Sequence, residues 1–138
     1  MSDFNETIVI QHSVAGALTV AAGAVPIPVP FPCELVAVSL AVGTAPTGAA
    51  ITVDVNKNGT TVFTDQNKRP KVAISQTAGG VTIDPALPAG TNYIYTPYPA
   101  AKPLGEFAAG DVVTVDVDTI GSGTAGSNLG VVLTVVKK

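Results

Sequence analysis

The residue types that carry out covalent chemistry are scarce in this chain, which has one cysteine, Cys33, and one histidine, His12. An imidazole can activate a thiol, so a Cys33–His12 pair would allow nucleophilic catalysis. However, Cys33 follows Pro32 and opens an apolar run at 35–38, where we expect a buried and inert thiol. We expect His12 to face solvent in a turn after a strand. We therefore predict no catalytic residue.

Aspartates are the next candidates, because carboxylate oxygens are the ligands that hard cations prefer. Asp116 and Asp118 share a strand face, and Asp54 and Asp111 could join them. The calcium-loop pattern, with its glycine and distal glutamate, is absent. An alternating strand also shows such side chains to water, which is the simpler explanation. We predict no metal site and no cofactor.

All three tyrosines lie within residues 91–99, as Tyr93, Tyr95 and Tyr98. Tyrosine combines a large apolar ring with a polar tip, which suits protein interfaces and sugar-binding surfaces. Tyr93 and Tyr95 would share one strand face, and Tyr98 would follow on a loop bounded by prolines. Three interpretations stay open: rings that cap one end of the domain, a protein interface, or a ligand site.

Alternation of apolar and polar residues predicts the strands that position these groups. In 51–56, Ile51, Val53 and Val55 would point inward, and Thr52, Asp54 and Asn56 outward to water. The following Asn58-Gly59 pair predicts a hairpin with 60–64. The pattern of 51–56 recurs at 113–118. Further strands are expected at 7–11, 17–21, 34–42 and 129–136, with weaker candidates at 71–75, 81–83 and 92–95, and a flexible connection at 121–127. No segment has a helical period, so we predict an all-β fold: an antiparallel β-sandwich that is jelly-roll-like.

Residues 1–12 are expected to form an N-terminal arm or first strand, and 13–138 a single β-sandwich domain. Ile8 and Ile10 alternate in the arm, which could add a strand to a neighbouring subunit. Prolines occupy every second position from Pro26 to Pro32. They remove the donors on one side, so this segment would pair along one edge only, as a protected edge strand or a connector. A proline-rich ligand for another domain is the alternative.

Charged residues make up 12% of the chain, about half the usual share, and the mean hydropathy is +0.43. No apolar stretch is long enough for a spanning helix, and no signal peptide is evident. The net charge is −3 without a basic cluster, so neither nucleic acid nor a membrane is an expected partner. The remaining explanation is a domain that buries surface against other protein subunits. A single cysteine suits synthesis in a reducing compartment.

Two phrases carry a family resemblance. Residues 47–59 (TGAAITVDVNKNG) and 109–118 (AGDVVTVDVD), followed by a Gly-Ser loop and a terminal strand, resemble the β-sandwich surface proteins of tailed-phage virions. The resemblance covers residues 33–136. That family includes capsid decoration proteins, head-fibre proteins and tail-associated proteins, which are often trimeric.

The resemblance implies a non-enzymatic capsid decoration protein, made in the host cytoplasm, that binds the outer surface of the shell as a homo-oligomer. A trimer is favoured, and the partners would be the major capsid protein or other virion proteins. The candidate interface residues are Ile8, Ile10, Tyr93, Tyr95 and Tyr98. The alternative is a tail- or fibre-associated module that binds carbohydrate or a receptor through the tyrosines.

Overall fold

The computed structural model describes residues 7–22, 25–82, 95–97 and 105–137. The described strands are β1 (Thr7–Ala17), β2 (Ile27–Pro28), β3 (Cys33–Ala41), β4 (Ile51–Lys57), β5 (Thr60–Thr61), β6 (Lys71–Val72), β7 (Ala78–Thr82), β8 (Tyr95–Pro97), β9 (Gly105–Phe107), β10 (Val112–Thr119) and β11 (Ser127–Lys137). A single 3-10 turn, η1 (Gln66–Lys68), accompanies them. Within these ranges, no helix has the length and hydropathy needed to cross a membrane.

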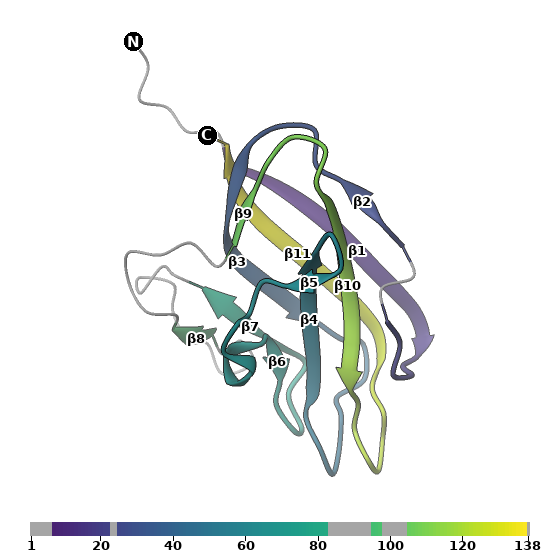
Figure 1. Ribbon diagram of the computed structural model, residues 1–138. Coiled ribbons are helices and arrows are strands. Elements are labelled where there is room, and N and C mark those ends of the chain that lie inside the picture. Colours follow the sequence, from purple (N-terminus) through teal and green to yellow (C-terminus); the bar gives the residue numbers. More distant parts are fainter. Residues whose placement is uncertain (1–6, 23–24, 83–94, 98–104, 138) are drawn as a thin grey trace.

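The strands form two sheets that pack face to face (Figure 1). The β11 sheet has the order β1-β11-β3-β7-β8, with β9 also beside β3; the β10 sheet has the order β2-β10-β4-β5, with β6 also beside β4. All pairings are antiparallel except β7–β8. The predicted all-β antiparallel sandwich is therefore confirmed, and the narrower jelly-roll topology stays a prediction.

Alternating β-branched residues build the core between the sheets. On β10 the inward positions are buried and the outward ones half-buried, and β11 repeats this pattern. Each buried Val, Leu or Ile contributes roughly 1.5–3 kcal/mol relative to an exposed one. The largest fully buried side chains are Phe63, Leu35, Leu40, Ile51, Leu129, Leu133, Val29, Val38, Val53, Val55, Val72 and Val81.

The β4–β5 hairpin confirms the Asn-Gly prediction. Asn58 has φ 51° and Gly59 has φ 87°, the two positive values that a type I′ turn requires. The pairs Asn56–Thr61 and Lys57–Thr60 close the hairpin, although β5 is only two residues long.

The two similar segments, 51–56 and 113–118, are neighbours in one sheet. Strands β4 and β10 pair antiparallel, with Val55 opposite Val115 and Asp54 opposite Asp116. Both strands meet the same environments, apolar toward the core and polar on the outer face. This shared environment explains why their patterns match.

The proline-rich segment forms an edge strand, as the preferred interpretation expected. β2 lies at the end of its sheet and pairs with β10. The Val29 N–H donates to the Asp111 carbonyl at 2.8 Å, and Val29 is fully buried. The prolines at 26, 28, 30 and 32 are exposed. By alternation their nitrogens face away from β10, so this edge offers few donors to another strand.

Some predicted boundaries were wrong. The strand expected at 7–11 is present but longer, because β1 crosses residue 12 and ends at Ala17, so the separate strand expected at 17–21 does not form. The stretch at 121–127, expected to be a flexible connection, is tied to another loop: the Thr47 N–H donates to the Thr124 carbonyl, and the Gly123 N–H donates to the Thr47 carbonyl, each at 3.0 Å. Strand β9 was not predicted.

Candidate functional site

The structure separates the two residues that could have formed a nucleophilic pair. Cys33 is fully buried and pairs with Lys137 of β11, whereas His12 on β1 pairs with Val131. Val131 and Lys137 are six residues apart on β11, so His12 and Cys33 are separated by roughly 20 Å along the strand direction. Burial raises the pKa of the Cys33 thiol, so it stays protonated and unreactive.

His12 does not face solvent in a turn, so that prediction was wrong. It lies within β1 on the same side as Ile10 and Val14, which pack against the core. Its ring lines an apolar hollow of about 230 Å³ at the side of the sandwich, together with Thr19, Val25, Val115 and other small residues. Burial lowers the pKa of the imidazole, which favours its neutral form.

Polar side chains form a bonded cluster on the outer face of the β10 sheet. Thr52, Asp54 and Asn56 point away from the core, as predicted, but they are only 5%, 6% and 9% exposed. Arg69 follows η1, reaches across β4 and binds Asp118 of β10 with Nη1–Oδ2 at 2.6 Å. The expectation that these β4 side chains meet water was therefore wrong, because the β5–β6 connection covers them.

Each carboxylate in this cluster has a protein partner. Thr61 Oγ1 donates to Asp54 Oδ1 at 2.6 Å, and Asn56 Nδ2 donates to Asp116 Oδ2 at 2.8 Å. Burial raises the pKa of Asp54, and the nearby charge of Asp118 adds to this effect; the bonds from Thr61 and the Val55 N–H and the charge of Arg69 oppose it. In the described ranges, no three His, Cys, Asp or Glu residues are arranged to hold a metal ion.

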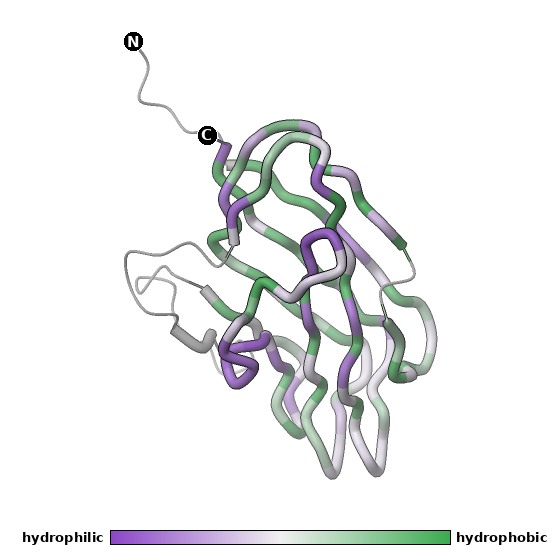
Figure 2. The backbone as a smooth tube through the Cα atoms, in the orientation of Figure 1, coloured by the Kyte–Doolittle hydropathy of each residue, from purple (hydrophilic) through white to green (hydrophobic). Residues whose placement is uncertain are grey.

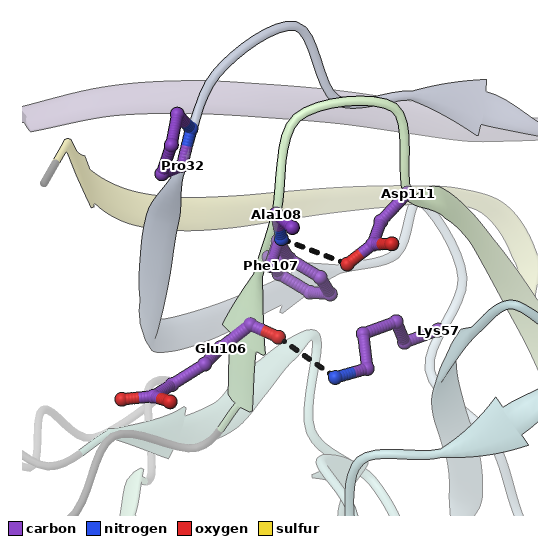
Figure 3. Close-up of a pocket in the computed structure, with 6 residues that line it drawn as sticks. All are labelled: Pro32, Lys57, Glu106, Phe107, Ala108 and Asp111. Atoms are coloured by element: carbon purple, nitrogen blue, oxygen red, sulfur yellow. Dashed lines mark hydrogen bonds between the residues drawn. The ribbon is translucent and has the colours of Figure 1, made fainter.

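Asp111 lies apart from that cluster, in the turn before β10. Its carboxylate accepts from the Ala108 N–H at 2.8 Å and from Asn58 Nδ2 at 3.0 Å, and these bonds lower its pKa. It borders an open pocket of about 380 Å³ that also contacts Lys57, Glu106, Phe107 and Pro32. Figure 3 shows the Lys57 ammonium donating to the Glu106 carbonyl across this pocket, at 3.0 Å. The bonds of Asp111 hold the turn before β10 against the β4–β5 hairpin.

The candidate interface residues fall in different parts of the sandwich. Ile8 and Ile10 are half-buried and pack against the core of their own chain, so they belong to β1 of the β11 sheet. Tyr95 begins β8 and pairs with Gly80 of β7. Tyr93 and Tyr98 lie outside the described residues, so the tyrosine surface stays a prediction.

One long stretch of the chain has no charged side chain of its own. From Thr7 to Cys33 the sequence has no Asp, Glu, Lys or Arg, and this run supplies β1, the following connection and β2. Val9, Val20 and Val25 within it are 52%, 62% and 52% exposed. We call this the charge-free side. The uninterrupted run between Glu6 and Glu34 is a sequence signal that reading individual motifs missed.

Charge gathers elsewhere on the molecule. Figure 2 shows strongly hydrophilic residues at the β4–β5 hairpin and around η1, which lies in the connection between β5 and β6 of the β10 sheet. Exposed valines on a surface without charge are typical of contact regions between proteins. The candidate functional site is therefore a contact surface on the charge-free side.

Comparison with known proteins identifies no relative: no family model, curated protein or solved structure matches the chain.

Proposed function

We propose that this chain is a non-enzymatic structural protein of a phage virion: a capsid decoration protein that binds the outer surface of the shell as a homo-oligomer. The observation that carries the assembly role is the charge-free side, with its exposed Val9, Val20 and Val25. Burial of apolar surface is the main favourable term in protein association, and no like charges in this run oppose contact.

The virion assignment rests on the resemblance carried by residues 47–59 and 109–118. These phrases form the adjacent strands β4 and β10 with their entering loops. Their polar residues form an internally bonded cluster, which suits a structural role for this part of the fold. The jelly-roll topology, which the strand pattern predicts, belongs to this proposal.

Binding to shells tests the function. Purified chain is added to capsids that lack it, and bound protein is measured by co-sedimentation; gold-labelled antibody then locates the chain on intact virions. We expect binding to capsids and label on heads. Label confined to tails, or no binding to capsids, would contradict the decoration role.

Matched charge variants test the surface. Val20→Asp puts one charge on the exposed charge-free side, and we expect capsid binding to weaken at least tenfold. Ile74→Asp is the control, because Ile74 is 49% exposed and lies outside that side. Equal effects of the two changes would show that the charge-free side is not the contact surface.

A further inference from the structure

Among the described residues, strand β1 has one edge with no strand partner. It ends the β11 sheet and pairs with β11 alone. Beyond that ladder, no backbone–backbone hydrogen bond among the described residues involves β1. An edge strand presents a row of open N–H and C=O groups, which can pair with another strand.

Other edges in the described part of the chain are short or protected. β2 carries exposed prolines at alternate positions, β5 and β6 have two residues each, and β8 has three. β1 has eleven residues and none of the lysines, prolines or inward charges that usually protect an edge. Its length and lack of protection distinguish it as an edge suited to pairing.

We propose that β1 pairs antiparallel with β1 of a second copy about a two-fold axis, which joins the two β11 sheets into one continuous sheet. This inference rests on the proposed assembly role and names the partner. Two-fold pairing is isologous and needs only one open edge on each copy, whereas a ring such as a trimer needs two different, complementary surfaces. Like charges directly opposite one another destabilise a strand pair, and this edge has no charge to repel its copy.

The register follows from the regular part of β1. Its ladder with β11 runs evenly to Val14 and is interrupted before Ala17. The two-fold axis keeps outward residues opposite outward residues, and centring it on the outward-facing Gln11 pairs the whole segment from Ile8 to Val14. These seven paired residues would span about 23 Å.

This register also brings an exposed side chain to a hollow. Opposite Ser13 it places Val9 of the partner subunit, and Val9 is 52% exposed in the single chain. Ser13 pairs with Gly130 of β11, and two shallow hollows of about 290 and 430 Å³ border these two small residues on the outer face. Val9 is thus positioned to cover the neighbouring copy's hollow, which gives the pairing a shape match.

Substitutions that place opposite charges at Gln11 test the pairing, with the purified chain. Gln11 is exposed, so Gln11→Lys and Gln11→Glu should fold normally, which circular dichroism and thermal unfolding check. We expect the wild-type chain and the control Thr60→Lys, changed at an exposed hairpin position, to be dimers by native mass spectrometry. Each Gln11 variant alone should dissociate with at least a tenfold higher constant, and an equimolar mixture of the two should recover a heterodimer.

Cross-linking gives a second readout that charge does not affect. Gln11→Cys should form a disulfide-linked dimer on mild oxidation, while the wild type should not, because Cys33 is fully buried. A wild-type monomer or trimer, or dimers unaffected by the Gln11 charges, would overturn the proposal. These measurements use no capsid, so a dimer that fails to bind shells would overturn the virion role and leave the pairing standing.

Discussion

Asp54 of β4 lies directly opposite Asp116 of β10, so two carboxylates share one row on the outer face of the β10 sheet. Like charges in this position are unfavourable, and Asp54 is only 6% exposed. The row is tolerated because Thr61 donates to Asp54 and Asn56 donates to Asp116. This arrangement makes stability sensitive to the charge of Asp54.

Asp54→Asn should stabilise the protein at neutral pH by up to about 1 kcal/mol, the scale of a cross-strand pair. Burial raises the folded-state pKa of Asp54 above its ordinary value of 3.8, and the nearby charge of Asp118 adds to this effect. A raised pKa means that the folded state holds this proton more tightly, so the resulting stability is present below pH 3.8 and is lost as pH rises through the folded pKa. The amide keeps an acceptor for Thr61 and removes the charge.

Thermal unfolding of the wild type and Asp54→Asn from pH 3 to pH 8 measures this effect. The variant should have the higher melting temperature at pH 7, and the difference should shrink toward pH 3. A constant difference across the range would show that the charge of Asp54 is not its cause.

Arg69→Ala should destabilise the fold by about 1 kcal/mol at pH 7. Arg69 and Asp118 have side chains that are 23% and 28% exposed, so solvent screens their ion pair in part. Loss of the guanidinium also removes the bond from Arg69 Nε to the Gln66 carbonyl. Urea unfolding of Arg69→Ala, Asp118→Ala and the double variant gives their coupling energy. Strictly additive losses would show that the pair itself contributes nothing.

Much of the fold could be predicted from sequence because alternation reports which face of a strand is buried. The β4, β10 and β11 strands, the Asn58-Gly59 turn and the proline edge all follow from local rules of this kind. What failed depends on distant segments. Nothing near His12 in the sequence shows that β1 continues past it along β11, and nothing near Asp54 shows that the β5–β6 connection returns to cover it.

The charge-free side could be predicted only in part from the sequence. Its run from Thr7 to Cys33 is visible in the sequence, but a run of residues becomes a surface only when the fold places its parts together. That step depends on β1 ending one sheet and β2 ending the other, which local patterns do not determine.

Substitutions at the hairpin should separate backbone strain from lost hydrogen bonds. Gly59→Ala should cost about 1 kcal/mol of stability, because alanine is strained at a φ of 87°. No steric clash adds to this cost, since no atom lies within 4 Å of the added Cβ. Asn58→Ala should cost more, since Asn58 also bonds Asp111 and accepts from the Val112 N–H at 2.9 Å. Free energies of unfolding in urea give both values, and a larger cost at Gly59 would contradict this account.

Two glycines in strands should differ in how much stability they lose on change to alanine. A Cβ at Gly80 would lie 2.1 Å from the Val38 carbonyl oxygen, at φ 147°, so Gly80→Ala should cost at least about 2 kcal/mol. At Gly130 the nearest atom is 4.0 Å away, and Gly130→Ala should change stability by no more than about 0.5 kcal/mol. Chemical unfolding compares them, and similar values would show that close backbone approach does not explain Gly80.

Restoring donors to the proline edge should promote aggregation without unfolding the domain. In Pro28→Thr with Pro30→Thr, both new side chains stand at exposed positions, while the Val29 bond to Asp111 is kept. Two N–H groups would then face outward from β2, where another chain can pair with them. Light scattering at a temperature below the unfolding transition should rise faster than in the wild type.

Pro28→Lys with Pro30→Lys is the matched control, because it restores the same donors but adds charges that oppose stacking of chains. Aggregation of the threonine variant no faster than that of the wild type would mean that the prolines do not protect this edge. Faster aggregation of the threonine variant alone would show that the restored donors promote stacking and that added charge blocks it.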